Sequence, residues 1–318
     1  MKEPKTLQEA ILYFADADRC IAYLAGCRWL DGIAACPTCG RTDVSYVAKR
    51  RVWQCKSRHP KCQFSIKVGT IFEDSPIPLG KWLAAMWMIA NCKNGISSWE
   101  IHRALKVTQK TAWFMLHRLR VTMQDPYIGA TLTGEVEADE TFIGGKARNM
   151  HASKRERRAL AENRGKSLVM GVLERGGKIK TAVVPNLSRP VLQSEVKKHV
   201  KAGAALYTDK MRSYIGLSPD YAHEIVDHAV EYVRGRVHTN GLENFWSLLK
   251  RGLNGTYVSV EPFHLFRYLD EQTFRFNNRA TKDNPLNDAD RFALTVSQIL
   301  GKRLTYKELT GKADARPF

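Results

Sequence analysis

The spacing of hydrophobic residues changes twice in the first part of the chain. Apolar residues recur at helical spacing over residues 6–30, but over residues 31–75 they form short β-branched and aromatic runs typical of strands. Helical spacing returns at residue 76 and continues to residue 127. We therefore expect an N-terminal helical segment (1–30), a small β-ribbon (31–75) and a helical region (76–127).

The helical region is expected to contain an apolar helix over 79–90 and then a pair of helices. Ser97 and Glu100 have the spacing of a capping box for the first helix of the pair, and Thr108 is a suitable N-cap for the second. A pair joined by so short a turn is typical of a helix-turn-helix, whose second helix could enter a major groove, although an ordinary helical hairpin has the same pattern. The polar residues that could contact DNA from the second helix are Gln109, Lys110, His117, Arg118 and Arg120.

Strand and helix patterns alternate in the second half of the chain. The expected elements are strands over 134–145, 167–174, 179–187, 204–210 and 223–233, and helices over 188–201, 238–253 and 261–279. This order predicts an α/β domain over residues 133–280. A helical tail follows over residues 281–318, where packing onto the core and dimerisation are both open.

Charge adds a constraint on the partner. The 318 residues include 50 Lys and Arg against 32 Asp and Glu, which gives a net charge of +18. No apolar run is long enough for a membrane helix, and the N-terminus has no apolar signal core, so we expect a cytoplasmic protein that meets a polyanion. Residues 146–166 carry much of the excess and could be a solvated surface loop or an arm that contacts DNA phosphates through Lys154, Arg155, Arg157 and Arg158.

The cysteines of the β-ribbon have the spacing of a structural zinc site. Cys36 and Cys39 are separated by two residues and followed by glycine, and Cys55 and Cys62 would supply the second pair of thiolates. Six residues separate Cys55 from Cys62, more than is usual, which makes His59 a rival for the fourth position. Four unrelated buried cysteines would be the alternative.

Three acidic residues follow or lie within apolar segments far apart in the sequence. Asp139 lies in a strand, Asp209 ends another strand, and Glu243 lies on a helix. Buried carboxylates are costly unless they are paired or bind a cation, and Mg²⁺ prefers oxygen ligands. Lys250 follows Glu243 by two helical turns and could reach a phosphate, while Asn240 precedes Glu243 by three residues and competes with it for the third position.

These motifs together resemble a bacterial insertion-sequence transposase of the DDE superfamily, in the ISXO2-like family with an N-terminal zinc ribbon. The matching stretches are CPTCG, FSIKVGTIFEDSPIPLGKW, the helix pair, VEADETFIGGK, LYTDK, HTNGLENFWSLLKRGLNGTY and FRFNNR. The resemblance implies a ribonuclease-H-like catalytic core. It also implies that Asp139 and Asp209 are the two aspartates, that Asn240 or Glu243 is the third residue, and that Lys250 is the lysine.

The implied activity is transfer of DNA strands with Mg²⁺ or Mn²⁺ as catalytic ion and Zn²⁺ as structural ion. Asp139, Asp209 and Glu243 would bind the catalytic ion, and Lys250 with Arg251 would hold flanking phosphates. The partners would be double-stranded DNA at the element ends and at the target, and a second copy of the chain in the DNA complex. A DNA-binding regulator derived from a transposase, or a metal-dependent nuclease that joins nothing, would be the alternatives.

Overall fold

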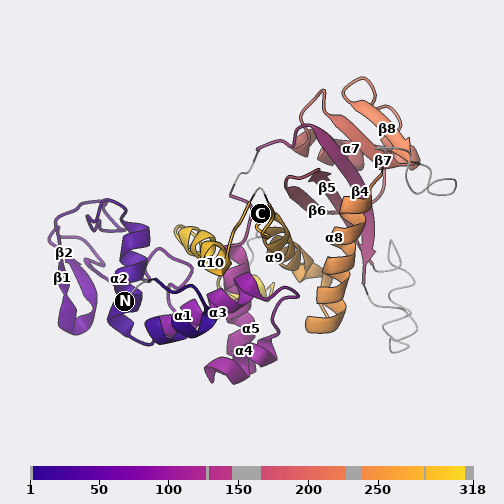
Figure 1. Cartoon of the computed structure of the whole chain (residues 1–318). Helices are drawn as coiled ribbons and strands as arrows, with labels where there is room; N and C mark the ends of the chain where they lie inside the picture. The colour runs from indigo at the N-terminus through magenta and orange to yellow at the C-terminus, as the bar shows by residue number, and fades with distance from the viewer. Residues whose placement is uncertain (1–2, 127–128, 145–165, 227–237, 283, 312–318) are drawn as a thin grey trace. The chain divides into compact units, whose positions relative to one another are not determined.

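The computed structural model describes residues 3–126, 129–144, 166–226, 238–282 and 284–311. The chain forms two compact units (Figure 1). Unit 1 consists of Met1–Gln124 together with Asn278–Phe318, and unit 2 consists of Asp125–Asn277. None of the helices in the described ranges has the length and apolar character needed to cross a membrane.

Unit 1 begins with two helices where the sequence predicts one. These are α1 (Leu7–Tyr13) and α2 (Ala17–Arg28). The prediction of one helix over 6–30 was wrong because Asp16 caps α2, its carboxylate accepting the backbone N–H groups of Asp18 and Arg19. A second helix therefore begins after Asp16, and α1 does not continue through it.

The ribbon of unit 1 is a three-stranded antiparallel sheet. Its strands are β1 (Val44–Val47), β2 (Val52–Cys55) and β3 (Gln63–Phe64), in the order β1-β2-β3, with the short helix η1 (Ala48–Arg50) between the first two. Trp53 in β2 stacks on Phe64, with ring centroids 6.0 Å apart, and also contacts the rings of Tyr46 and Trp29. These few rings are the core of a very small sheet.

The helices after the ribbon pack around one central helix. They are α3 (Leu79–Asn91), α4 (Ser98–Leu105) and α5 (Gln109–Val121). Every residue of α3 from Trp82 to Ala90 is buried, which fits a helix surrounded by others. The predicted capping box of Ser97 and Glu100 and the predicted N-cap Thr108 are confirmed, and Lys106 adopts a left-handed conformation at the turn between α4 and α5.

Residues after Asn278 return to unit 1. The tail contains α10 (Asp288–Ser297) and α11 (Tyr306–Leu309), and α10 packs against α3. Phe292 of α10 is buried and contacts the rings of Phe14, Tyr23 and Trp87 at centroid distances of 5.7, 5.9 and 5.0 Å. Residues from the N-terminal and the C-terminal parts of the chain thus share one core in unit 1.

Unit 2 contains a five-stranded mixed sheet. Its strands are β4 (Glu135–Ile143), β5 (Ser167–Glu174), β6 (Ile179–Val184), β7 (Ala205–Asp209) and β8 (Ala222–Val226), in the order β6-β5-β4-β7-β8. The pairs β6-β5 and β5-β4 are antiparallel, whereas β4-β7 and β7-β8 are parallel. The strand expected over 223–233 is thus seen as far as Val226, and its later residues lie outside the described ranges.

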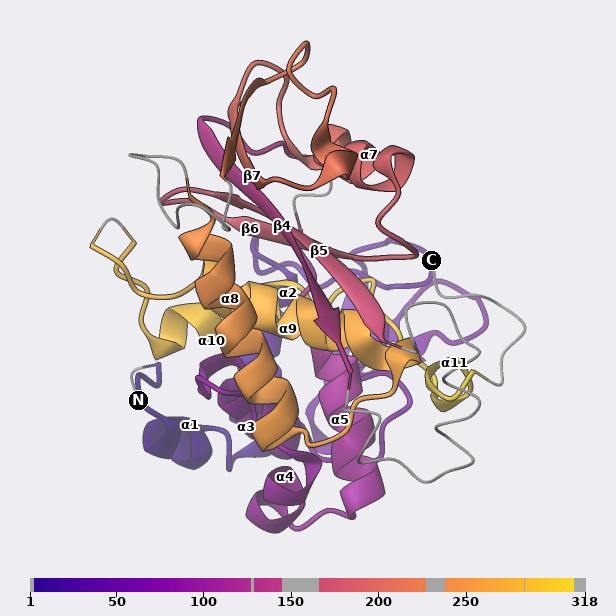
Figure 2. The ribbon, with the colours of Figure 1, turned by 90° about the vertical axis from the view of Figure 1, so that its right-hand side faces the viewer.

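Helices cover both faces of this sheet (Figure 2). They are α7 (Arg189–His199), α8 (Asn240–Arg251) and α9 (Leu265–Asn277), with the short helices η4 (Arg212–Tyr214), η5 (Gly252–Thr256) and η6 (Pro262–His264). One core lies between α7 and the sheet, and a second lies between the sheet and α8 with α9. Successive residues of β5 alternate between these two cores, as Leu168 and Val169 do. The α/β character expected from the sequence is confirmed.

Removing the Phe292 side chain should destabilise unit 1. Phe292→Ala is expected to lower the free energy of unfolding by about 3–5 kcal/mol, because a fully buried aromatic ring leaves a cavity that the neighbouring rings only partly fill. Thermal and denaturant unfolding measure the change. Leu294→Ala on the same helix is the control, since Leu294 is 38% exposed and its loss should cost little. Equal stability of the two variants would contradict the packing of the tail.

Candidate functional site

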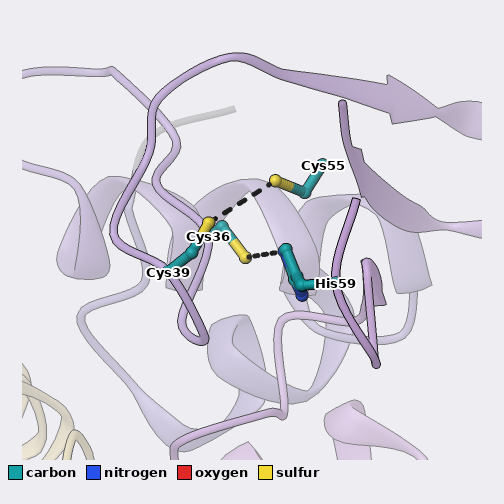
Figure 3. A group of neighbouring side chains, drawn as sticks. All are labelled: Cys36, Cys39, Cys55 and His59. Carbon is teal, nitrogen blue, oxygen red and sulfur yellow. Dashed lines mark hydrogen bonds between the residues drawn. The ribbon is translucent and has the colours of Figure 1, made fainter. Parts of the chain in front are cut away.

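The first group of candidate ligands lies in the ribbon of unit 1. Cys36, Cys39, Cys55 and His59 each offer one ligand atom, and these four atoms all lie within 4.8 Å of one another (Figure 3). The two cysteines of the CPTCG motif precede β1, Cys55 ends β2, and His59 lies in the loop that follows β2. Gly40 has a φ of 73°, and its N–H donates to the carbonyl of Cys36, which closes the turn that holds the first two ligands.

The distances within this group suit a tetrahedral zinc ion. The sulfurs of Cys39 and Cys55 are 3.7 Å apart, and the sulfur of Cys36 is 3.5 Å from Nε2 of His59. With Zn–S bonds of about 2.3 Å and Zn–N bonds of about 2.0 Å, a tetrahedron separates two sulfurs by about 3.8 Å and a sulfur from a nitrogen by about 3.5 Å. The residues therefore fit structural zinc.

The fourth member of the group is His59, and Cys62 is not part of it. The long loop after β2 folds His59 back toward Cys36, while the carbonyl of Cys62 accepts the N–H of Cys55 and extends the pairing of β2 with β3. Nδ1 of His59 lies 2.7 Å from the carbonyl of Pro60. With its N–H donated there, the imidazole keeps the lone pair of Nε2 for a metal. The expectation of Cys62 as ligand is corrected accordingly.

The candidate acids of unit 2 come from neighbouring strands. Glu137 and Asp139 are two positions apart on β4 and therefore face the same side of the sheet, which α8 covers. The parallel pairing of β4 with β7 ends at Ala138 opposite Thr208, so that Asp139 and Asp209 follow at adjacent positions. The register thus brings together two aspartates that are far apart in the sequence.

The third acid acts on the same carboxylate from α8. Burial, together with the negative charges of Asp209 and Glu243, raises the pKa of Asp139 to about 6. The indole N–H of Trp246 and a backbone N–H lower the pKa and only partly offset these effects. Among the described residues, these carboxylate oxygens are not grouped within 4.8 Å as the zinc ligands are. Asp139 nevertheless experiences the charges of both other acids.

Glu243, Asn240, Lys250 and Arg251 are all exposed on α8. Helical spacing places Asn240, Glu243 and Lys250 along one face, three and seven residues apart. An uncharged amide at residue 240 would add an oxygen without adding charge. Glu243 is the residue of the two whose charge reaches Asp139.

Two further residues of this site, Trp246 and Glu137, were not identified from the sequence. Trp246 donates its indole N–H to Oδ2 of Asp139 at 2.9 Å. Glu137 is 1% exposed and accepts the N–H of Leu242 at 3.1 Å and Nε of Arg175 at 3.0 Å. Trp246 lies three residues after Glu243, a spacing that places both on one face of the helix. Glu137 lies two residues before Asp139, a spacing that places both on one face of the strand. Either spacing could have indicated from the sequence that the residue belongs to the site.

A neutral carboxyl group lies on the opposite face of β4. Burial, together with the negative charges of Asp139 and Asp209, raises the pKa of Glu140 to about 9. The hydroxyl of Tyr214, which is fully buried, donates to Oε1 of Glu140. Glu140 therefore keeps its proton at neutral pH in the protein without metal.

The helix pair of unit 1 presents fewer basic residues than expected. Lys110 is exposed and Gln109 is half-buried, but Arg118 and Arg120 are only 4% and 1% exposed. The guanidinium of Arg118 lies over the rings of Trp82 and Phe114 and donates to the carbonyl of Glu73. The expectation that Arg118 and Arg120 contact DNA is therefore wrong, because the end of α5 lies in the core.

His117 is likewise fully buried. The predicted contacts of the basic arm, which are Lys154, Arg155, Arg157 and Arg158, lie outside the described residues.

Two family models match this chain. Residues 131–277 match the ISXO2-like transposase domain, and residues 15–64 match the transposase zinc-ribbon domain. The resemblance found in the sequence is thereby confirmed at the level of these two regions, which match the ISXO2-like transposase domain and the transposase zinc ribbon.

A relative from Halobacterium salinarum is described as an uncharacterized protein in transposable element ISH50. It is 29% identical over 259 residues, which cover 76% of this chain and 84% of that protein. No solved structure matches the chain.

The identity of the fourth zinc ligand can be tested by metal content. His59→Ala should lose most of the bound zinc, because three thiolates leave the tetrahedron open, whereas Cys62→Ser should keep it. Zinc in the purified proteins is measured by mass spectrometry. Zinc retained by His59→Ala and lost by Cys62→Ser would contradict the group seen in the structure.

Glu140 should make stability depend on pH. Because the pKa of Glu140 in the folded protein is about 9 and its ordinary value is 4.5, the unfolded chain releases a proton that the folded protein holds, and stability falls as pH rises between these values. Glu140→Gln should flatten this decline and raise the melting temperature at pH 8 in EDTA by a few degrees. Glu261→Gln, at an exposed position of the same unit, is the control. A steeper decline in Glu140→Gln would refute the neutral state.

Proposed function

We propose that the chain is a DDE transposase that binds the terminal inverted repeats of an insertion sequence, cleaves the element ends by metal-dependent hydrolysis and joins the 3′-hydroxyl to target DNA. The observation that carries this proposal is the effect of Asp209 and Glu243 on Asp139 within a domain that matches ISXO2-like transposases. Two acids from separate segments act there on the carboxyl group of a third, an arrangement that a DNA-binding regulator does not need.

The sheet of unit 2 supports a ribonuclease-H-like core. Its first strand, β4, lies in the centre of the order β6-β5-β4-β7-β8, with antiparallel neighbours on one side and parallel ones on the other. The candidate acids belong to β4, to the adjacent β7 and to α8. They therefore come from the middle of the sheet and from the helix that covers it.

The carboxylates suit a hard divalent cation. Their donor atoms are all oxygens, and the raised pKa of Asp139 reflects burial and negative charge that a bound cation would offset. Asp139, Asp209 and Glu243 would hold Mg²⁺ or Mn²⁺, with Asn240 as the alternative third residue. When bound, the cation would activate the attacking oxygen and stabilise the charge that develops on the scissile phosphate.

The protein's own side chains would orient the DNA around this site. Lys250 lies on the face of α8 that carries Glu243, and together with Arg251 it would hold the phosphates that flank the scissile one. These cations are exposed and therefore available to the DNA backbone. Their contribution would be to position the substrate, the main requirement of phosphoryl transfer.

DNA recognition would belong largely to unit 1. The zinc ribbon and the pair α4 and α5, acting as a helix-turn-helix, would contact the terminal repeats, with Gln109 and Lys110 at the start of α5 as base or phosphate contacts. The net charge of +18 supports additional backbone affinity, to which the segment 146–166 would contribute. Pairing of two element ends would bring two copies of the chain together.

The carboxylate site can be tested by a single substitution. Asp139→Ala should reduce cleavage of a labelled terminal-repeat duplex in Mg²⁺ by at least about 1,000-fold, because the central ligand for the cation is lost. Binding of the same duplex, measured by gel shift, should be nearly unchanged. Undiminished cleavage by this variant would refute the proposed site.

The same assay separates the proposed function from its alternatives and resolves the third position. With a target plasmid present, joined products support the transposase, cut products alone indicate a nuclease, and a shifted band alone indicates a regulator. Glu243→Gln and Asn240→Ala form a matched pair of exposed positions on α8. We expect the first to impair cleavage more than the second, because the charge of Glu243 reaches Asp139.

A further inference from the structure

A single hydrogen bond connects α8 to the central acid of the site. The indole N–H of Trp246 donates to Oδ2 of Asp139 at a distance of 2.9 Å. Trp246 is only 4% exposed, so solvent has little access to its ring. The protein itself therefore holds the carboxylate of Asp139, through this indole and through the backbone N–H of Glu140.

The sheet is shaped to receive this indole ring. Gly171 on β5 lies directly opposite Asp139 in the β4–β5 pairing. A Cβ atom on Gly171 would lie 2.9 Å from both Cη2 and Cζ2 of Trp246 and 3.0 Å from Cδ2 of Leu242. Glycine destabilises the interior of a strand and often marks a position where another group approaches the backbone closely. At residue 171 that group is the indole ring of Trp246.

A second contact holds α8 against the sheet one turn earlier. The buried carboxylate of Glu137 accepts the N–H of Leu242, while Nε of Arg175 donates to its other oxygen. Gly241 fits beside this carboxylate, because a Cβ at residue 241 would lie 2.8 Å from Oε2 of Glu137. These contacts fix the first turn of α8 on β4. Trp246, one turn later on the helix, then lies beside Asp139.

We propose that Trp246 is a positioning residue for the cation site, holding the Asp139 carboxylate through Oδ2 in the orientation that a cation would meet, and that Gly171 provides the space this ring requires. This inference rests on the proposed function of the carboxylate site. Carboxylates that bind metals are themselves oriented by hydrogen bonds, and such partners set metal affinity.

The choice of an indole as donor is chemically suited to this role. The side chain of tryptophan donates one hydrogen bond and carries no charge. A lysine or arginine in its place would neutralise Asp139 and compete with a cation for the carboxylate. The indole therefore orients Asp139 while the negative charge of the site is preserved.

Replacing the N–H without changing the shape of the ring tests this proposal. Incorporation of 3-benzothienylalanine at position 246 exchanges the N–H for a sulfur in the full-length protein. Binding of Mn²⁺, followed by electron paramagnetic resonance, should weaken by about 10- to 100-fold. Trp87→Phe, in the buried core of unit 1, is the control for loss of an indole and should bind Mn²⁺ as the unaltered protein does.

Gly171→Ala provides an independent variant that keeps the indole N–H. Its methyl group should displace the ring and weaken Mn²⁺ binding to a similar extent, whereas Gly255→Ala, at a position with no atom near the added Cβ, should not. Melting temperatures in EDTA report any general loss of folding in each variant. A weakening confined to the metal titration supports a positioning role.

The outcomes distinguish this inference from the function on which it rests. Unaltered Mn²⁺ affinity in both the sulfur analogue and Gly171→Ala, together with loss of binding in Asp139→Ala, would overturn the role of Trp246 alone. Mn²⁺ binding that survives Asp139→Ala would overturn the cation site itself. Reduced melting temperatures with unchanged Mn²⁺ affinity would also overturn the proposal, since the ring would then serve only the packing of α8.

Discussion

The chemistry available to unit 2 depends on the packing of α8 against β4. The acids come from segments that are too far apart in the sequence for local interactions to bring them together. Their proximity depends on the register between β4 and β7 and on the packing of α8 against β4. Glu137 anchors the start of α8 and Trp246 anchors its middle. An error of one residue in the register of β4 would turn Asp139 to the opposite face of the sheet.

The carboxyl groups on the two faces of β4 have different surroundings. Asp139 faces α8 and two other acids, whereas Glu140 faces the buried Tyr214 on the side of α7. Burial and the charge of Asp209 raise the pKa of both, whereas the charge of Glu243 on α8 is seen at Asp139. Adjacent acids in the sequence can therefore serve separate purposes: Asp139 would bind the proposed cation, whereas Glu140 is a half-buried, neutral partner of Tyr214.

Local signals in the sequence were sufficient for most elements but not for the contacts between them. The caps at Ser97 and Thr108 follow from side chains within three residues of each helix start, and they are confirmed. The burial of Arg118 could not be foreseen, because it depends on Trp82, which reaches it only when α3 and α5 pack. The bond of Trp246 to Asp139 joins positions 107 residues apart and depends on a sheet register that the sequence does not specify. His59 was recognised as a rival of Cys62 from loop length, but only the folded loop decides between them.

The return of the chain from unit 2 to unit 1 has a consequence for biosynthesis. Because α10 supplies Phe292 to the core around α3, unit 1 cannot complete its core until the ribosome has made all of unit 2 and the residues beyond it. A polypeptide released early, for example by a frameshift within the DDE domain, would lack that helix. Unit 1, which contains the zinc ribbon, can therefore complete its fold only in a molecule whose DDE domain has already been translated in full.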